Sequence, residues 1–254
     1  MMKAKEFVAT LKKIATEYKT LYVYGCFGAP LKESTKARYT TESSYKYNKT
    51  AELQANVEEA VKQGNVFGFD CVCLVKGVLW GWNGNFEKIY GGASYKANGV
   101  PDVNADNMLK YCDEVSSDFS HLEPGEYLQM SGHCGVYIGE GLAVECTPKW
   151  DNCVQITAVG NIGKKPGYNT RTWEKHGKLQ FVDYTIEAIP EEPSPKEEPI
   201  ISETPVIEEE LIIPEAPTVE GEPKKSLYYS FLLFLKKIID LLISKEENKY
   251  GTKK

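Results

Sequence analysis

The spacing of apolar residues changes once along this chain, and this change constrains the fold more than any other feature. Apolar side chains recur at helical spacing over residues 7–18 and again over residues 51–63, where Gly64 ends the pattern. From Glu126 onward, short segments rich in Val, Ile, Tyr and Leu alternate with turn residues, as in an antiparallel meander. These segments are residues 126–130, 133–139, 142–147 and 154–159. Helices followed by antiparallel strands predict an α+β fold, with N-terminal helices packed on the sheet.

Composition divides the chain into three parts. The periodic pattern covers residues 1–186 and predicts one folded domain. Residues 187–225 contain eight of the thirteen prolines and twelve Glu against three Lys, which predicts a disordered, self-repelling linker. Residues 226–254 contain an apolar run with Lys236 and Lys237 on one side, followed by a basic tail. This last part predicts a short amphipathic helix and not a membrane span.

The distribution of charge excludes one class of partner. The linker carries a net charge of −9 and the C-terminal segment +3, so the formal net charge of −6 leaves the folded domain close to neutral. Non-specific binding to phosphates requires an excess of Lys and Arg, so no nucleic-acid partner is predicted. Residues 1–13 mix charged and apolar side chains without an uninterrupted apolar core. We therefore expect no signal peptide and a cytoplasmic location.

The seven cysteines do not form the pattern of a structural site. Their number is odd, and no pair of Cys-x-x-Cys knuckles occurs. Neither a complete disulfide framework nor a zinc site is therefore predicted, and we expect no metal and no cofactor. Most of these cysteines are expected to be reduced, buried and small apolar side chains.

Cys71 has a different setting from the other cysteines. It directly follows Asp70, which predicts an N-cap at the start of an apolar helix within residues 69–82. Backbone NH groups and the positive end of the helix dipole then face the sulfur and favour its thiolate, which is the nucleophilic form. The same NH groups can stabilise an oxyanion. A buried structural cysteine is the commoner interpretation of such a residue taken alone.

Three histidines limit the choice of a general base. His121 and His176 lie in polar stretches and are expected to be solvated. His133 opens the predicted strand 133–139, and the nearby Gly132 and Gly135 leave room for a substrate backbone to approach. His133 is therefore the predicted partner of Cys71.

Glu145 is the candidate for orienting the His133 ring. If residues 139–141 form a three-residue hairpin loop, Leu142 lies opposite Ile138, and Glu145 shares a face with His133 on a diagonal within reach. A two-residue loop would point Glu145 away. The assignment of the third residue depends on this turn.

Four blocks of residues carry a resemblance to a known family. They are Tyr22-Val23-Tyr24-Gly25, Asp70-Cys71-Val72-Cys73-Leu74-Val75, Leu122-Glu123-Pro124-Gly125-Glu126 and Gly132-His133-Cys134-Gly135-Val136-Tyr137-Ile138-Gly139. In this order they resemble the signature blocks of NlpC-type papain-fold cell-wall cysteine peptidases over roughly residues 5–185. The nearest likeness is to catalytic domains of endolysins from phages of Gram-positive, clostridia-like hosts.

The resemblance implies a papain-like fold and assigns a role to each matching residue. Cys71 matches the nucleophile, His133 the general base and Glu145 the third polar position. Tyr22 matches a tyrosine that lines the oxyanion side. The family usually has Ser and Gly after the nucleophile, where this chain has Val72 and Cys73, and its third residue is more often His, Asn or Gln. Cys71 is preferred over Cys73 as nucleophile because it directly follows Asp70.

The implied function is peptidoglycan hydrolysis through a cysteine thioester. The bond expected to be cleaved is a stem-peptide amide, in the first place D-glutamyl to diamino acid. A Cys-His-Glu triad also resembles related amidases, so an N-acetylmuramoyl-L-alanine amidase is an alternative, as is a non-catalytic wall- or membrane-associated module. The expected partner is bacterial peptidoglycan, reached after release from the cytoplasm. The C-terminal helix is expected either to contact a membrane surface or to self-associate.

Overall fold

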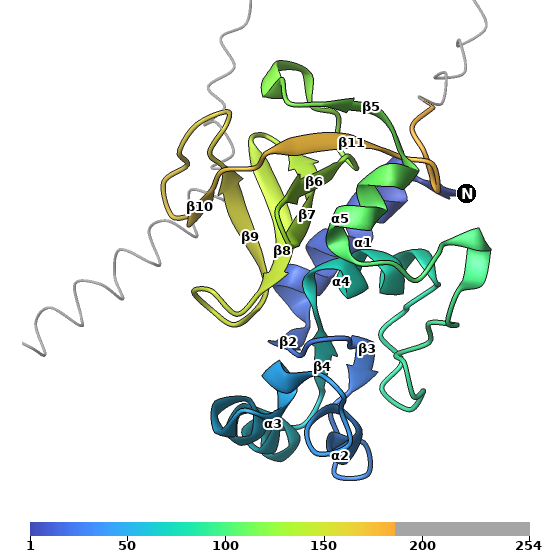
Figure 1. Ribbon diagram of the computed structural model, residues 1–254, viewed down its shortest axis with the longest axis vertical. Helices are drawn as coiled ribbons and strands as arrows, with labels where there is room; N and C mark the ends of the chain where they lie inside the picture. The colour runs from blue at the N-terminus through green and yellow to red at the C-terminus, as the bar shows by residue number, and fades with distance from the viewer. Residues whose placement is uncertain (186–254) are drawn as a thin grey trace, which may run out of the picture. The chain divides into compact units, whose positions relative to one another are not determined.

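The computed structural model describes residues 1–185 (Figure 1). The predicted linker at residues 187–225 and the predicted amphipathic helix at residues 226–254 lie outside the described residues. Helices and strands are mixed along the described chain, which contains one large mixed sheet. The prediction of a fold that combines helices with a large sheet is confirmed at this level.

The large sheet has seven strands in the order β10-β9-β8-β7-β6-β11-β5. Their bounds are β5 Cys112–Ser116, β6 Tyr127–Met130, β7 His133–Gly139, β8 Leu142–Thr147, β9 Cys153–Val159, β10 Thr170–Arg171 and β11 Lys175–Leu179. The four strands predicted from the sequence are the neighbours β6 to β9, which pair in antiparallel fashion. β10 joins β9 in parallel, so the sheet is mixed and not wholly antiparallel as predicted.

A second sheet lies in the N-terminal half, where the sequence pattern predicted mainly helices. It contains β2 Lys19–Tyr22, β4 Val66–Phe69 and β3 Phe27–Pro30, with β2 parallel and β3 antiparallel to β4. A further short parallel pair joins β1 Met2–Lys3 to β12 Val182–Asp183. The order of helices first and strands later is therefore wrong for this half. Strands of two to four residues are too short to show an alternating pattern.

The helices predicted from apolar spacing are present. Within residues 1–185 the α-helices are α1 Ala4–Glu17, α2 Lys36–Tyr39, α3 Ala51–Gln63, α4 Cys71–Leu79 and α5 Ala105–Met108, and short 3₁₀ turns cover Lys46–Lys49, Ala97–Gly99, Leu109–Tyr111 and Phe119–His121. The Thr50 hydroxyl caps α3 by accepting from the Leu53 NH, and Gly64 follows its last turn at a positive φ of 69°. None of these helices combines the length and apolarity that crossing a bilayer requires.

α4 is the buried centre of the fold. All nine of its residues are buried, and Figure 1 shows the helix between the large sheet and the three-stranded sheet. α1 covers the same core with one apolar face, formed by Phe7, Val8, Leu11 and Ile14. Each large apolar side chain buried in this way contributes about 1.5–3 kcal/mol to folding. This packing holds the N-terminus of α4 against strands β7 and β8.

The β7–β8 turn differs from the prediction but gives the same register. Gly139 pairs with Leu142 around the two-residue loop Glu140-Gly141, whose φ angles are both positive at 56° and 74°. Positive φ at both positions is the geometry of a type I′ hairpin. A bulge between Tyr137 and Gly139 then shifts the register, so that Gly135 lies opposite Glu145. The predicted pairing of Leu142 with Ile138 is wrong, yet Glu145 still lies diagonally across from His133.

Candidate active site

Cys71 is the first residue of α4, and Asp70 is its N-cap. One carboxylate oxygen of Asp70 accepts the Cys73 NH at 2.6 Å, and the other accepts the Gly25 NH at 2.7 Å. Asp70 therefore caps the helix and also ties the segment after β2 to the start of α4. The predicted helix start is confirmed, and it leaves the Cys71 sulfur beside the first backbone NH groups of the helix.

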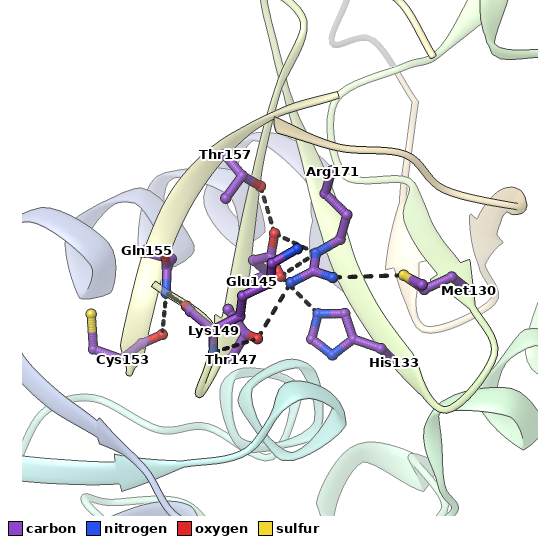
Figure 2. A network of polar contacts seen from close by, with 9 residues as sticks. All are labelled: Met130, His133, Glu145, Thr147, Lys149, Cys153, Gln155, Thr157 and Arg171. Carbon is purple, nitrogen blue, oxygen red and sulfur yellow. Dashed lines mark hydrogen bonds and ion pairs between the residues drawn. The ribbon is translucent and has the colours of Figure 1, made fainter. Parts of the chain in front are cut away.

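His133 and Glu145 form a direct contact across β7 and β8. The Nε2 atom of His133 lies 2.7 Å from Oε2 of Glu145, and the Glu145 side chain is fully buried (Figure 2). Since Nε2 faces the carboxylate, Nδ1 is the ring nitrogen left for the Cys71 thiol, with which His133 also interacts. The structure thus brings together the three residues that the sequence analysis selected.

The charges of the site favour a thiolate on Cys71. A hydrogen bond from the Cys134 thiol, opposed by burial and supported by His133, lowers the pKa of Cys71 to about 5. Burial works to lower the pKa of His133, but its interactions with Cys71 and Glu145 outweigh burial and raise it above the ordinary value. Between these two pKa values the pair exists as thiolate and imidazolium, the reactive form of a cysteine nucleophile.

Two further polar groups hold the Glu145 carboxylate. The Nε of Arg171 lies 2.8 Å from one carboxylate oxygen and 2.6 Å from the other, and the Thr157 hydroxyl donates to Oε1 at 2.7 Å (Figure 2). Burial alone would raise the pKa of Glu145, but the hydrogen bonds from His133 and Arg171 hold it below the ordinary value. The sequence pattern does not indicate Arg171 or Thr157 as site residues. Only the strand order, which places β9 and β10 beyond β8, could have indicated them.

Trp173 covers one face of the His133 ring. Its ring is stacked with the His133 ring at an interplanar angle of 10° and a centroid distance of 5.7 Å. Gly135 makes this possible, because a Cβ there would lie 2.9 Å from the Trp173 ring. The expected role of Gly135, leaving room for a substrate, is therefore wrong. Gly132 has open space where a Cβ would point, so no neighbouring side chain fills that side.

Tyr22 ends β2 beside the thiol. It is buried, and its pKa is raised well above the ordinary range by burial and by the nearby charges of Cys71 and Asp70. Its hydroxyl consequently keeps its proton and is available as a donor. The ring packs edge-on against Tyr47 at 5.5 Å, which limits its movement. The structure thus places Tyr22 close enough to Cys71 for their charges to interact.

The other two histidines have different surroundings from each other. His121 is exposed, as predicted. His176 is buried, although the sequence favoured a solvated side chain, because β11 inserts between β6 and β5. Its Nδ1 contacts the Glu126 carboxylate, and its Nε2 lies 2.8 Å from the Asp118 carbonyl oxygen. Both ring nitrogens have partners, so His176 fits a structural role.

The remaining cysteines are poor nucleophiles. All seven are free thiols, and burial raises the pKa of each of the six others. For Cys73, the alternative nucleophile, burial and the Asp70 charge hold the pKa well above the ordinary value. In the part of the chain that the structure describes, no group of three or more His, Cys, Asp or Glu side chains could hold a metal ion.

We expect iodoacetamide to label Cys71 selectively. Because the thiolate is the reactive form, the labelling rate should rise as the pH increases through about 5, where the Cys71 pKa lies, and level off near neutrality. Cys153 is the matched control, since it is more exposed than Cys71 but burial raises its pKa to about 11. Peptide mass spectrometry after timed labelling measures both rates. Equal rates for the two residues at pH 6 would contradict an activated Cys71.

A cavity borders the start of α4. It has a volume of about 340 Å³, and its lining includes Asp70, Val72 and Cys73 of the α4 start. The lining also includes three exposed tyrosines and the ion pair between the buried Lys76 of α4 and Asp102; the tyrosines are Tyr24, Tyr45 and Tyr95. Aromatic faces next to polar groups suit a peptide or sugar ring. The cavity lies next to the start of α4, but Cys71, His133 and Glu145 are not among its lining residues.

The arrangement supports acyl transfer to a thiol. Cys71 lies at a helix N-terminus, the mostly buried His133 interacts with it, and the Glu145 carboxylate contacts the other nitrogen of the histidine ring. Comparison of the sequence with known family models gave no match, and comparison with curated proteins gave no match either.

Proposed function

We propose that this chain is a peptidoglycan hydrolase with a papain-like catalytic domain that cleaves a stem-peptide amide through a cysteine thioester. One observation carries the proposal of hydrolysis: Cys71 lies at the N-terminus of a buried helix and interacts with a histidine whose other nitrogen contacts Glu145 at 2.7 Å. Four ordered sequence blocks that resemble NlpC-type enzymes support the choice of the cell wall as substrate.

The first half of the reaction forms the acyl enzyme. The Cys71 thiolate adds to the amide carbonyl carbon, and the carbonyl electrons move to oxygen. Backbone NH groups at the start of α4 and the Tyr22 hydroxyl stabilise this oxyanion, and each such donor contributes about 3 kcal/mol in hydrolases studied by mutation. The carbon–nitrogen bond then breaks while the His133 imidazolium gives its proton to the leaving amine.

The second half releases the acid. Neutral His133 takes a proton from water, the oxygen adds to the thioester carbon, and the carbon–sulfur bond breaks. Cys71 leaves as thiolate and His133 keeps the proton, so the starting ion pair is restored. Glu145 remains ionised throughout and holds the imidazole ring in place, as the carboxylate of a triad does.

The proposed scissile bond joins D-glutamate to the diamino acid of the stem peptide, and a muramoyl-L-alanine bond is the alternative. Purified Gram-positive walls digested with the full chain distinguish the two by mass spectrometry. We expect new free amino groups on the diamino acid. New amino groups on L-alanine would instead identify an amidase.

A parallel digest with a Cys71→Ala variant separates this activity from contaminating hydrolases. If walls of several cross-link types yield no new amino groups above that control, peptidoglycan is not the substrate.

A further inference from the structure

Arg171 has contacts that go beyond a simple surface ion pair. Its Nε lies within 2.8 Å of both oxygens of the Glu145 carboxylate. One terminal nitrogen donates to the Thr147 hydroxyl at 3.3 Å, and the other reaches the Met130 sulfur at 3.7 Å (Figure 2). All three nitrogens of the guanidinium therefore have a partner in or beside the site.

The surroundings keep this guanidinium in one place. Its Cζ lies 4.9 Å from the Trp150 ring centroid and 5.7 Å from that of Trp173, the indole that stacks with His133. The Arg171 side chain is only 11% exposed, and Glu145 is fully buried. A carboxylate without access to water requires a fixed cation or hydrogen-bond donors if it is to remain ionised. Arg171 supplies both.

We propose that Arg171 is a positioning residue, which fixes the Glu145 carboxylate against the His133 ring and offsets part of the carboxylate's charge. As a part of catalysis this role rests on the proposed function. The positioning of Glu145 against His133 does not depend on the proposed function, because it is a property of the protein without substrate.

The positive charge of Arg171 changes the pKa of the Glu145–His133 pair in a predictable direction. When either Glu145 or His133 binds a proton, the pair gains one positive charge. The nearby positive charge of Arg171 opposes this protonation and lowers the pKa of the pair. Removing the charge should therefore make the pair hold its proton to higher pH. A residue that only supports the fold would not move this titration.

The other charged groups near His133 are unchanged by such a substitution. Cys71 faces the ring from α4, and Cys134 follows on β7. Asp106 of α5 accepts the NH of the neighbouring Gly132 at 3.0 Å, and the Lys149 ammonium lies over the Trp150 ring. Their contributions are shared by the parent and the variants, so a difference between these proteins reports on residue 171.

The test compares two substitutions that differ in charge. Arg171→Gln removes the charge but keeps a side-chain NH for the carboxylate, which favours a folded protein, whereas Arg171→Lys keeps the charge. Arg38→Gln is the matched control, because Arg38 is exposed and stacks on Tyr90, outside the Glu145 network. Nitrogen-15 NMR follows the ring titration of the three histidines in the full chain, and a His133→Gln variant assigns the His133 signal.

We expect the His133 titration to move up by on the order of one pH unit in Arg171→Gln. It should stay within a few tenths of a unit of the parent in Arg171→Lys and in Arg38→Gln. An unmoved or lowered titration in Arg171→Gln overturns the proposal.

Wall digestion adds a second readout. The high-pH limb of kcat should shift in the same direction in Arg171→Gln, with little change in KM, since Arg171 acts through Glu145 and does not contact substrate. If the parent digests no wall while the NMR shift appears, the proposed function fails and the role of Arg171 stands.

Discussion

Replacing Cys71 with alanine is expected to reduce wall hydrolysis by about 10⁴-fold or more. The variant lacks the sulfur that forms the thioester, and burial holds the other six thiols in their protonated form. The release of amino groups from purified walls measures the loss. Because the side chain is small and the helix keeps its Asp70 cap, circular dichroism and the unfolding midpoint should change little.

Two cysteine variants serve as controls for this result. Cys73→Ala tests the alternative nucleophile, which lies two residues further along α4. Cys153→Ala removes a more exposed thiol on β9. Both should keep activity within a few-fold of the parent. Activity that survives in Cys71→Ala and disappears in Cys73→Ala would move the nucleophile to Cys73.

Replacing His133 with glutamine should lower hydrolysis by about 10³-fold, within the range that a general acid–base group contributes. A second effect follows from the electrostatics. His133 is one of the groups that lower the Cys71 pKa to about 5, so its loss should raise that pKa. Iodoacetamide labelling of Cys71 at pH 6 should consequently slow down, whereas labelling at high pH, where the thiolate forms in both proteins, should differ little.

His121→Gln is the control for the histidine prediction, because His121 is exposed and lies outside the site contacts. It should leave both hydrolysis and labelling unchanged. If Cys71 in the His133→Gln variant is labelled as fast as in the parent at pH 6, Cys71 and His133 do not form an ion pair. This conclusion holds even if the variant has lost hydrolysis.

For the turn between β7 and β8, the sequence predicts a hairpin but not its exact geometry. The positions of Gly139 and Gly141 indicated a hairpin, but two loop lengths were compatible with them. The structure combines the shorter loop with a bulge before Gly139. A bulge adds one residue to one strand and restores the register that the shorter loop would have lost. Packing of Val136 and Val144 in the core favours this register, and sequence spacing does not reveal it.

The residues that surround Glu145 could not be predicted from the sequence. Arg171 and Trp173 lie about 26 and 28 positions after Glu145, in a stretch without a clear apolar period. They reach the site because β10 pairs with β9, and β9 pairs with β8. The sequence predicts open space for a substrate at Gly135, but the Trp173 ring fills that space in the folded protein.

Local sequence patterns predict the parts of the site that depend on neighbours within one turn or one strand. The Asp70 cap before Cys71, the apolar run of α4 and the strand that begins at His133 are all local patterns. Three other features appear only once the chain is folded: the burial of His176, the register that brings Glu145 to His133, and the contacts of Arg171. The physical reason is that these contacts depend on strand order, on a bulge and on side-chain packing between segments far apart in the chain.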